Sequence, residues 1–131
     1  MSFVVFLIFL TFFVLIGVTI YLCIVPFSAP TLNPEFSSAT PTLTNGTSTG
    51  TIHGGTISFV PTTSAVLNLP ILFSSTLSFT PKAIMLSSLT STTSSTGLFA
   101  TNISSSGFTV NSTAIVSSVG NPTYSFSFIV V

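Results

Sequence analysis

The first 25 residues form one apolar block that contains no charged side chain. The block is MSFVVFLIFLTFFVLIGVTIYLCIV, and as an α-helix it would be about 38 Å long at roughly 1.5 Å per residue. Large apolar side chains would lie on every side of that helix, so no side is suited to water. Leaving about twenty of them wet would cost tens of kcal/mol at roughly 1.5–3 kcal/mol each, so the helix has to be buried.

Three environments could bury this helix. A signal peptide is expected to have a basic segment before an apolar stretch of about 7–15 residues, whereas this stretch is longer and no Lys or Arg precedes it. A transmembrane anchor needs about 20 apolar residues, which fits, but anchors usually have Lys or Arg beside one end. The core of a polymer needs no flanking charge. A subunit that waits in the membrane and then joins a filament would use the second and third environments in turn.

Proline marks the end of the helix. Pro26 cannot continue the hydrogen-bond ladder and biases Val25 away from helical angles, so we expect the helix to occupy residues 1–25. Residues 26–50 contain four prolines and are expected to be a Pro/Ser/Thr-rich linker or a first irregular strand. Glu35, the only acidic residue of the chain, falls in this segment and is expected to be solvated.

Short runs rich in Val, Ile, Thr and Phe follow from residue 51 onward, separated by turns. In the last run, Tyr124, Phe126 and Phe128 share one face of a strand, with serines opposite. His53 precedes Gly54 in a turn-like setting, and Lys82 is expected to be a solvated edge residue. The expected strands are Thr56–Pro61, Ala65–Phe73, Thr76–Thr80, Ala83–Leu89, Gly97–Ile103, Phe108–Val116 and Thr123–Val131.

This pattern predicts an α+β fold, with one long N-terminal hydrophobic helix followed by a small all-β, immunoglobulin-like sandwich. The helix is expected over residues 1–25, the linker over 26–50 and the sandwich over 51–131. No stretch after residue 26 has a convincing helical period.

Residue counts argue against an enzyme. The chain has one Glu and no Asp, so it has no pair of carboxylates for glycoside hydrolysis and no aspartate to orient His53. Cys23 lies in the apolar helix, where a thiol is inert, and one chain lacks the several ligands that a metal site needs. The chain has no basic patch for nucleic acid. We therefore expect no catalysis, cofactor, metal or nucleic acid.

The polar residues of the chain are mostly hydroxyl-bearing Ser and Thr rather than charged residues. The sequence has 23 Ser and 22 Thr, whereas only 2% of its residues are charged. Three Asn-x-Ser/Thr sequons begin at Asn45, Asn102 and Asn111, and the Ser/Thr clusters around Thr92 and Ser105 are candidates for O-linked sugar. Bound carbohydrate would keep an uncharged surface wet and shield it from proteases.

The whole chain resembles an archaeal type IV pilin: a charge-free helix of about 25 residues, a proline-marked break and a Ser/Thr-rich β domain that ends in a strand. Bacterial members have a glutamate at the fifth mature position, whereas this chain has Val5, which favours the archaeal branch. The near-absence of charge resembles the pilins of acid- and heat-loving archaea. Members of that family are made with a short basic leader that is cut off before the apolar helices polymerise. The resemblance implies this processing if Met1 is the first residue of the mature chain, and not if Met1 is the initiator.

We therefore expect a structural subunit of a helical extracellular filament that adheres to surfaces or cells. Its partners would be copies of itself, the membrane before assembly and covalent glycans. Two alternatives are a monomeric membrane-anchored surface or envelope glycoprotein and a virion membrane structural protein. Residues expected to pack in the filament core are Phe3, Phe6, Phe9, Phe12, Phe13, Val14, Gly17 and Ile20.

Overall fold

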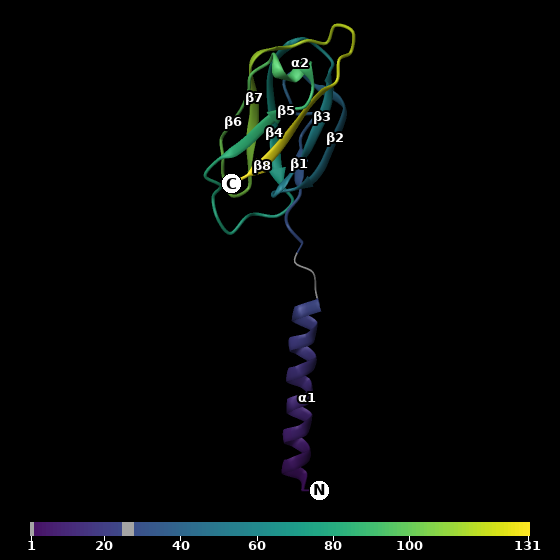
Figure 1. Cartoon of the computed structure of the whole chain (residues 1–131), viewed down its shortest axis with the longest axis vertical. Helices are drawn as coiled ribbons and strands as arrows, with labels where there is room; N and C mark the ends of the chain where they lie inside the picture. The colour runs from purple at the N-terminus through teal and green to yellow at the C-terminus, as the bar shows by residue number, and fades with distance from the viewer. Residues whose placement is uncertain (1, 25–27) are drawn as a thin grey trace.

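The computed structural model describes residues 2–24 and 28–131, and these form one long helix and a β region of two antiparallel sheets (Figure 1). The expectations about Met1, Val25 and Pro26 fall outside the described residues, and so does the side chain of Cys23. The α+β class predicted from the sequence is confirmed.

The N-terminal helix α1 spans Phe3–Ile24, as the apolar block predicts. Ser2 begins it, because its carbonyl oxygen accepts from the Phe6 N–H at 3.2 Å and its hydroxyl accepts from the Val5 N–H at 3.4 Å. A hydroxyl in this position satisfies a backbone donor that the first turn of a helix leaves without a partner.

The first sheet has the strand order β1-β4-β7-β6, and all its pairs are antiparallel. Its inward side chains alternate with outward ones along β4 and the first part of β7, as expected for a strand with one face on a core. The bounds of the strands are Leu32–Pro34 for β1, Ala65–Phe73 for β4, Leu98–Thr101 for β6 and Gly107–Val116 for β7.

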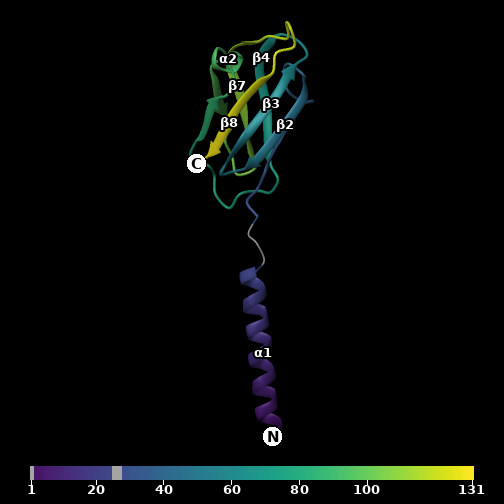
Figure 2. The same ribbon diagram turned by 45° about the vertical axis from the view of Figure 1, so that its right-hand side comes forward.

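The second sheet has the order β2-β3-β8-β5 and is also antiparallel throughout. The bounds are Leu43–Thr51 for β2, Gly54–Pro61 for β3, Ile84–Ser88 for β5 and Tyr124–Val130 for β8. The two sheets lie as two layers (Figure 2) and share one apolar core. Fully buried members of that core include Leu69 and Val110 from the first sheet and Phe59, Phe126 and Phe128 from the second.

Six of the eight strands agree with runs expected from the sequence, and the other two, β1 and β2, were not expected as separate strands. β1 and most of β2 fall in residues 26–50, so the segment expected as a linker or a first irregular strand contributes to both sheets. β2 pairs with β3 except at an irregularity between Thr44 and Thr47, and its sequence LTNGTSTGT has one large apolar side chain, Leu43. A polar strand at the edge of a sheet lacks the alternation of apolar and polar residues by which a strand is predicted from sequence.

The expected strand Thr76–Thr80 is wrong, because these residues have no strand partner and form an irregular segment. Only Leu77 of this segment is buried, and its N–H donates to the Ser105 carbonyl at 2.8 Å. The expectation of no helix after residue 26 is also wrong. A short helix, α2, spans Ser91–Ser94 and is capped by the Thr90 hydroxyl, which accepts from the Thr93 N–H.

The turn-like setting predicted for His53 agrees with the structure. Ile52 and His53 form the turn between β2 and β3, with Thr51 paired to Gly54. Residues 102–106 connect β6 to β7, and the Ser104 N–H donates to the Gly107 carbonyl at 2.9 Å.

Candidate functional site

The candidate site is the surface of α1, which the described β region leaves uncovered. Each described side chain from Phe3 to Ile20 is exposed. By contrast, the β region buries its own core, in which Phe59 and Phe126 have no exposed surface. Soluble proteins rarely leave a large continuous apolar surface in water, so this surface indicates contact with lipid or with another protein.

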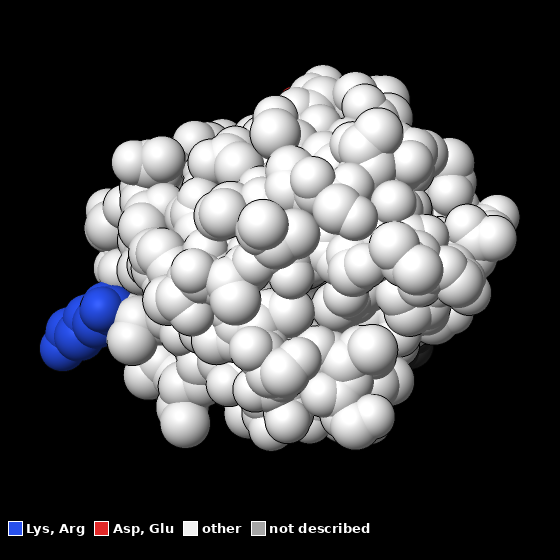
Figure 3. Space-filling model, turned by 90° about the horizontal axis from the view of Figure 1, so that it is seen from above, with Lys and Arg blue, Asp and Glu red and all other residues white. Residues whose placement is uncertain are grey.

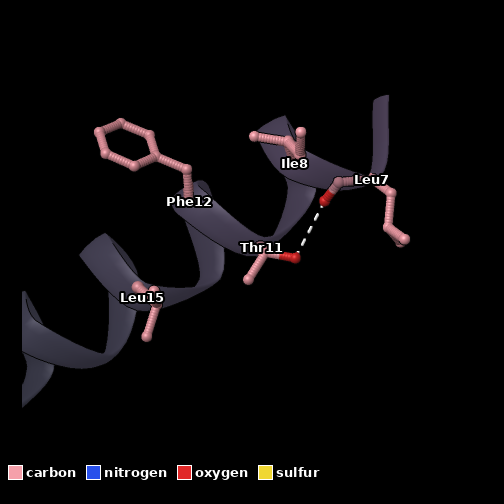
Figure 4. Close-up of a pocket in the computed structure, with 5 residues that line it drawn as sticks. All are labelled: Leu7, Ile8, Thr11, Phe12 and Leu15. Carbon is pink, nitrogen blue, oxygen red and sulfur yellow. Dashed lines mark hydrogen bonds between the residues drawn. The ribbon is translucent and has the colours of Figure 1, made fainter. Parts of the chain in front are cut away.

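The threonines of α1 hide their polar groups within the helix. The Thr11 hydroxyl donates to the Leu7 carbonyl at 2.9 Å, and the Thr19 hydroxyl donates to the Leu15 carbonyl at 2.8 Å. Figure 4 shows the first of these bonds among apolar side chains that project outward from the helix. A helix whose hydroxyls and backbone groups are bonded internally is suited to a medium without water.

The residues predicted for filament-core packing lie around α1 rather than on one stripe. Their large members have between 51% and 77% of their surface exposed. These are Phe3, Phe6, Phe9, Phe12, Phe13, Val14 and Ile20. At Gly17, a β-carbon would meet no atom within 4 Å beyond its chain neighbours and the backbone of α1 itself. The structure therefore exposes all eight positions, and one copy brings none of them together in a pocket of its own.

By length and composition, α1 is also able to cross a membrane. Its window Phe3–Ile20 contains no charged residue and is apolar enough for a span of 18 residues, with no part of it buried. This feature makes association with a membrane compatible with the structure.

The β region is almost free of charge. Glu35 and Lys82 are exposed, as the sequence predicts, and His53 is exposed as well. Figure 3 shows one cationic side chain that projects from a surface that is almost entirely uncharged in that view. Hydroxyl pairs cover part of this surface, such as Thr49 with Thr56 and Ser58 with Ser125, each with 2.7 Å between oxygens.

The three sequons differ in accessibility. Asn45 and Asn102 are exposed and adopt left-handed backbone angles, with φ of 50° and 51°. Asn111 is half-buried, and its amide is engaged on both sides. It donates through Nδ2 to the Thr101 hydroxyl at 2.7 Å and accepts through Oδ1 from Asn68 at 2.9 Å. A sugar on Nδ2 of Asn111 would disturb these bonds.

The two candidates for O-linked sugar also differ. The Thr92 hydroxyl is half-buried, and its oxygen lies within hydrogen-bond distance of the Thr123 carbonyl, at 3.2 Å, and of the Thr90 hydroxyl, at 3.1 Å. Ser105 lies in the loop between β6 and β7 and is half-buried as well. The two candidates therefore differ in the hydrogen bonds that hold the Thr92 hydroxyl, not in burial.

Sequence reasoning missed the bonded pair of amides, Asn68 and Asn111. Asn68 lies between two buried leucines, Leu67 and Leu69, and this alternation marks it as outward-facing. Its partner on β7 depends on the strand register, which contains an irregularity between Val66 and Asn68. No local signal gives that register.

Comparisons with protein-family models, curated proteins and solved structures found no match to this chain.

Proposed function

We propose that the chain is the structural subunit of a helical extracellular filament of the archaeal type IV pilus kind. The single observation that carries this proposal is α1, which is apolar on every side and uncovered over Phe3–Ile20. About fifteen large side chains at roughly 1.5–3 kcal/mol each represent tens of kcal/mol of burial, far more than the net stability of a small domain. Packing against the same helix in other copies supplies that burial.

Two details favour a bundle of helices over a permanent lipid anchor. The described residues that follow the helix, 28–34, contain no Lys or Arg, whereas anchors usually have such residues near a membrane surface. Gly17 offers a place for close approach of a second helix, because small residues let helix backbones come together. The membrane would hold the subunit before assembly.

We further propose that the β region is an immunoglobulin-like sandwich with an altered last strand. In that fold, strands A, B, E and D form one sheet and C, F and G form the other. The order β1-β4-β7-β6 corresponds to the first sheet, and β5-β8-β3 corresponds to the second. One difference from the immunoglobulin-like fold is the strand in the position of G. Strand G is the last in the chain of that fold, whereas β3, which occupies its position here, precedes β4.

A tyrosine at the start of β8 supports this assignment. The Tyr124 hydroxyl accepts from the Ser117 N–H at 2.8 Å, across the connection from β7. The ring is 3% exposed and stacks on Phe59 with 5.7 Å between ring centres. Immunoglobulin-like sandwiches use a tyrosine at the equivalent strand, with its hydroxyl bonded to the backbone a few residues upstream.

In the filament that we propose, the β regions form the outside and present hydroxyls and attached sugars to the surroundings. The uncharged surface suits this position, because neighbouring subunits meet without charge repulsion. The expected role is passive adhesion to surfaces or cells from an extracellular location.

The test is to shear intact cells, pellet the released material and examine it by electron microscopy and mass spectrometry. Thin filaments that contain this chain are expected, with a mass per subunit above 13.6 kDa if sugars are attached. Recovery of the chain only in the detergent-soluble membrane fraction, without filaments, would contradict the proposal.

Replacing Val14 by Glu gives a second test. Val14 is exposed on α1, so the substitution leaves the β core untouched but places a carboxylate in the helix bundle. Burying an unpaired charge costs several kcal/mol, so we expect loss of filaments, while the matched Val14→Leu chain still assembles. Filament yield from sheared cells is the measurement, and normal yield with Val14→Glu would argue against a dry helical core.

The second candidate is a monomeric membrane-anchored surface or envelope glycoprotein, favoured by the length of α1 alone. A virion membrane structural protein would use the same helix in the same way. Both predict retention in membranes and no filament.

A further inference from the structure

The outward face of the sheet β1-β4-β7-β6 carries a regular pattern of neutral side chains. Asn68 on β4 pairs with Asn111 on β7, which pairs with Phe99 on β6, so the three lie in one row across the sheet. Two positions along the strands, a second row contains Pro70, Thr109 and Thr101. The first row places an aromatic ring beside two amides.

Hydrogen bonds fix the polar part of this face. Asn68 donates through Nδ2 to Asn111 Oδ1 at 2.9 Å, and Asn111 donates through Nδ2 to the Thr101 hydroxyl at 2.7 Å. An amide group has two N–H donors. Among the bonds of the described residues, this ladder uses one N–H of each amide, so the orientation of the amides is set while donors remain for a ligand.

A small hollow adjoins the second row. Its volume is about 160 Å³, and its apolar wall includes Pro70 and Leu72. Its polar wall is formed by Asn102, Ser104 and Thr109. Sites for drug-sized ligands are larger, roughly 300–1,000 Å³, so this hollow suits one small ring with an apolar and a polar side.

We propose that this face binds a neutral saccharide carried by another molecule. A pyranose ring has one face of C–H groups, which packs on an aromatic ring such as Phe99, and a rim of hydroxyls, which pair with amides and other hydroxyls. This inference rests on the proposed function, because it gives the partner to which the filament adheres.

Because the chain has almost no charged residues, we expect its partner to be an uncharged polymer. Anionic polymers are held by clusters of Lys and Arg, and the only cation of this kind, Lys82, precedes β5 in the other sheet. Phe99 is 44% exposed, so its ring is accessible without rearrangement of the core.

Binding is tested with the full chain in detergent micelles, produced in a host that attaches no sugars. Isothermal titration with dextran, mannan and N-acetylglucosamine oligomers is expected to show saturable binding of at least one of them, and heparin is the polyanionic control. Replacing Phe99 by Ala is expected to weaken that binding about tenfold or more, and Asn68→Leu is expected to weaken it as well. The thermal unfolding midpoint of each variant checks that the chain still folds.

Phe79→Ala is the matched control, because Phe79 is similarly exposed, at 50%, but lines a different hollow together with Ile52 and His53. It should bind like the unmodified chain. Absence of saturable binding to all three neutral probes, equal binding of heparin, or equal weakening by Phe79→Ala would each overturn the proposal. If filaments form but bind no saccharide, the saccharide inference is wrong and the proposed filament stands. If the chain binds saccharide but forms no filament, the proposed filament is wrong and the saccharide inference stands.

Discussion

At the scale of single residues, buried hydroxyls supply hydrogen-bond acceptors where strand pairing is interrupted. The Ser112 hydroxyl accepts from the Leu67 N–H at 2.9 Å, where the register between β4 and β7 shifts. The Thr93 hydroxyl accepts from the Ser125 N–H at 2.9 Å. Because an unpaired backbone donor is costly in a core, these hydroxyls have a structural role distinct from that of the exposed ones.

Replacing Ser112 by Ala should destabilise the β region. The substitution leaves the Leu67 N–H buried without its acceptor, which costs about 1–3 kcal/mol. Urea unfolding of the full chain in detergent, followed by near-ultraviolet circular dichroism, measures this loss. Ser88→Ala is the control, since Ser88 is exposed on β5. Equal midpoints for the two variants would show that the Ser112 hydroxyl has no such role.

Sequon occupancy should follow the accessibility of each asparagine. We expect sugar on Asn45, which is exposed, and none on Asn111, whose Nδ2 donates to Thr101. Asn102 is also exposed, but it lines the hollow of the face that we propose to bind saccharide, so that proposal requires Asn102 to be bare. Mass spectrometry of peptides from the natively produced chain measures occupancy at each site. Sugar on Asn111 with the other two sites bare would contradict this order.

At the scale of elements, the sequence predicts most of the fold from local pattern. The apolar block predicts α1, and the alternation of apolar and polar residues predicts β4 and β8. β2 was missed because its nine residues contain one large apolar side chain and obtain their strand structure from pairing with β3. The helix surface could likewise be predicted from the sequence. The saccharide-binding face that we propose could not, because it depends on the register of three strands.

A substitution at Gly17 tests whether α1 packs closely against the same helix of another copy. A β-carbon at this position meets no atom within 4 Å beyond its chain neighbours and the backbone of its own helix, so leucine should leave the fold of one chain unchanged. In a filament whose helices approach at Gly17, the added side chain separates the backbones. We therefore expect Gly17→Leu to reduce filament yield strongly, while Val18→Leu has little effect. Electron microscopy of sheared material compares them, and normal filaments with Gly17→Leu would exclude close approach at this residue.

At the scale of the whole molecule, the near-absence of ionisable groups predicts that stability changes little with pH. Stability depends on pH only through groups that bind protons differently in the folded and unfolded chain. In the described β region the acidic, basic and imidazole groups are Glu35, Lys82 and His53, and all three are exposed. We expect the urea midpoint to stay nearly constant between about pH 3 and about pH 8. A clear fall as carboxyl groups become protonated would contradict this expectation.

The position of β8 has a consequence for the order of folding during synthesis. β8 lies inside its sheet, between β3 and β5, although all the other strands precede it in the chain. The sheet cannot be completed until Tyr124–Val130 have left the ribosome, and until then β3 and β5 lack the strand that joins them. Pairings between such distant segments form slowly, because the chain must close a long loop first. The apolar helix precedes the β region in the chain. In the filament subunit that we propose, the helix would therefore reach a membrane while the β region is still unfolded.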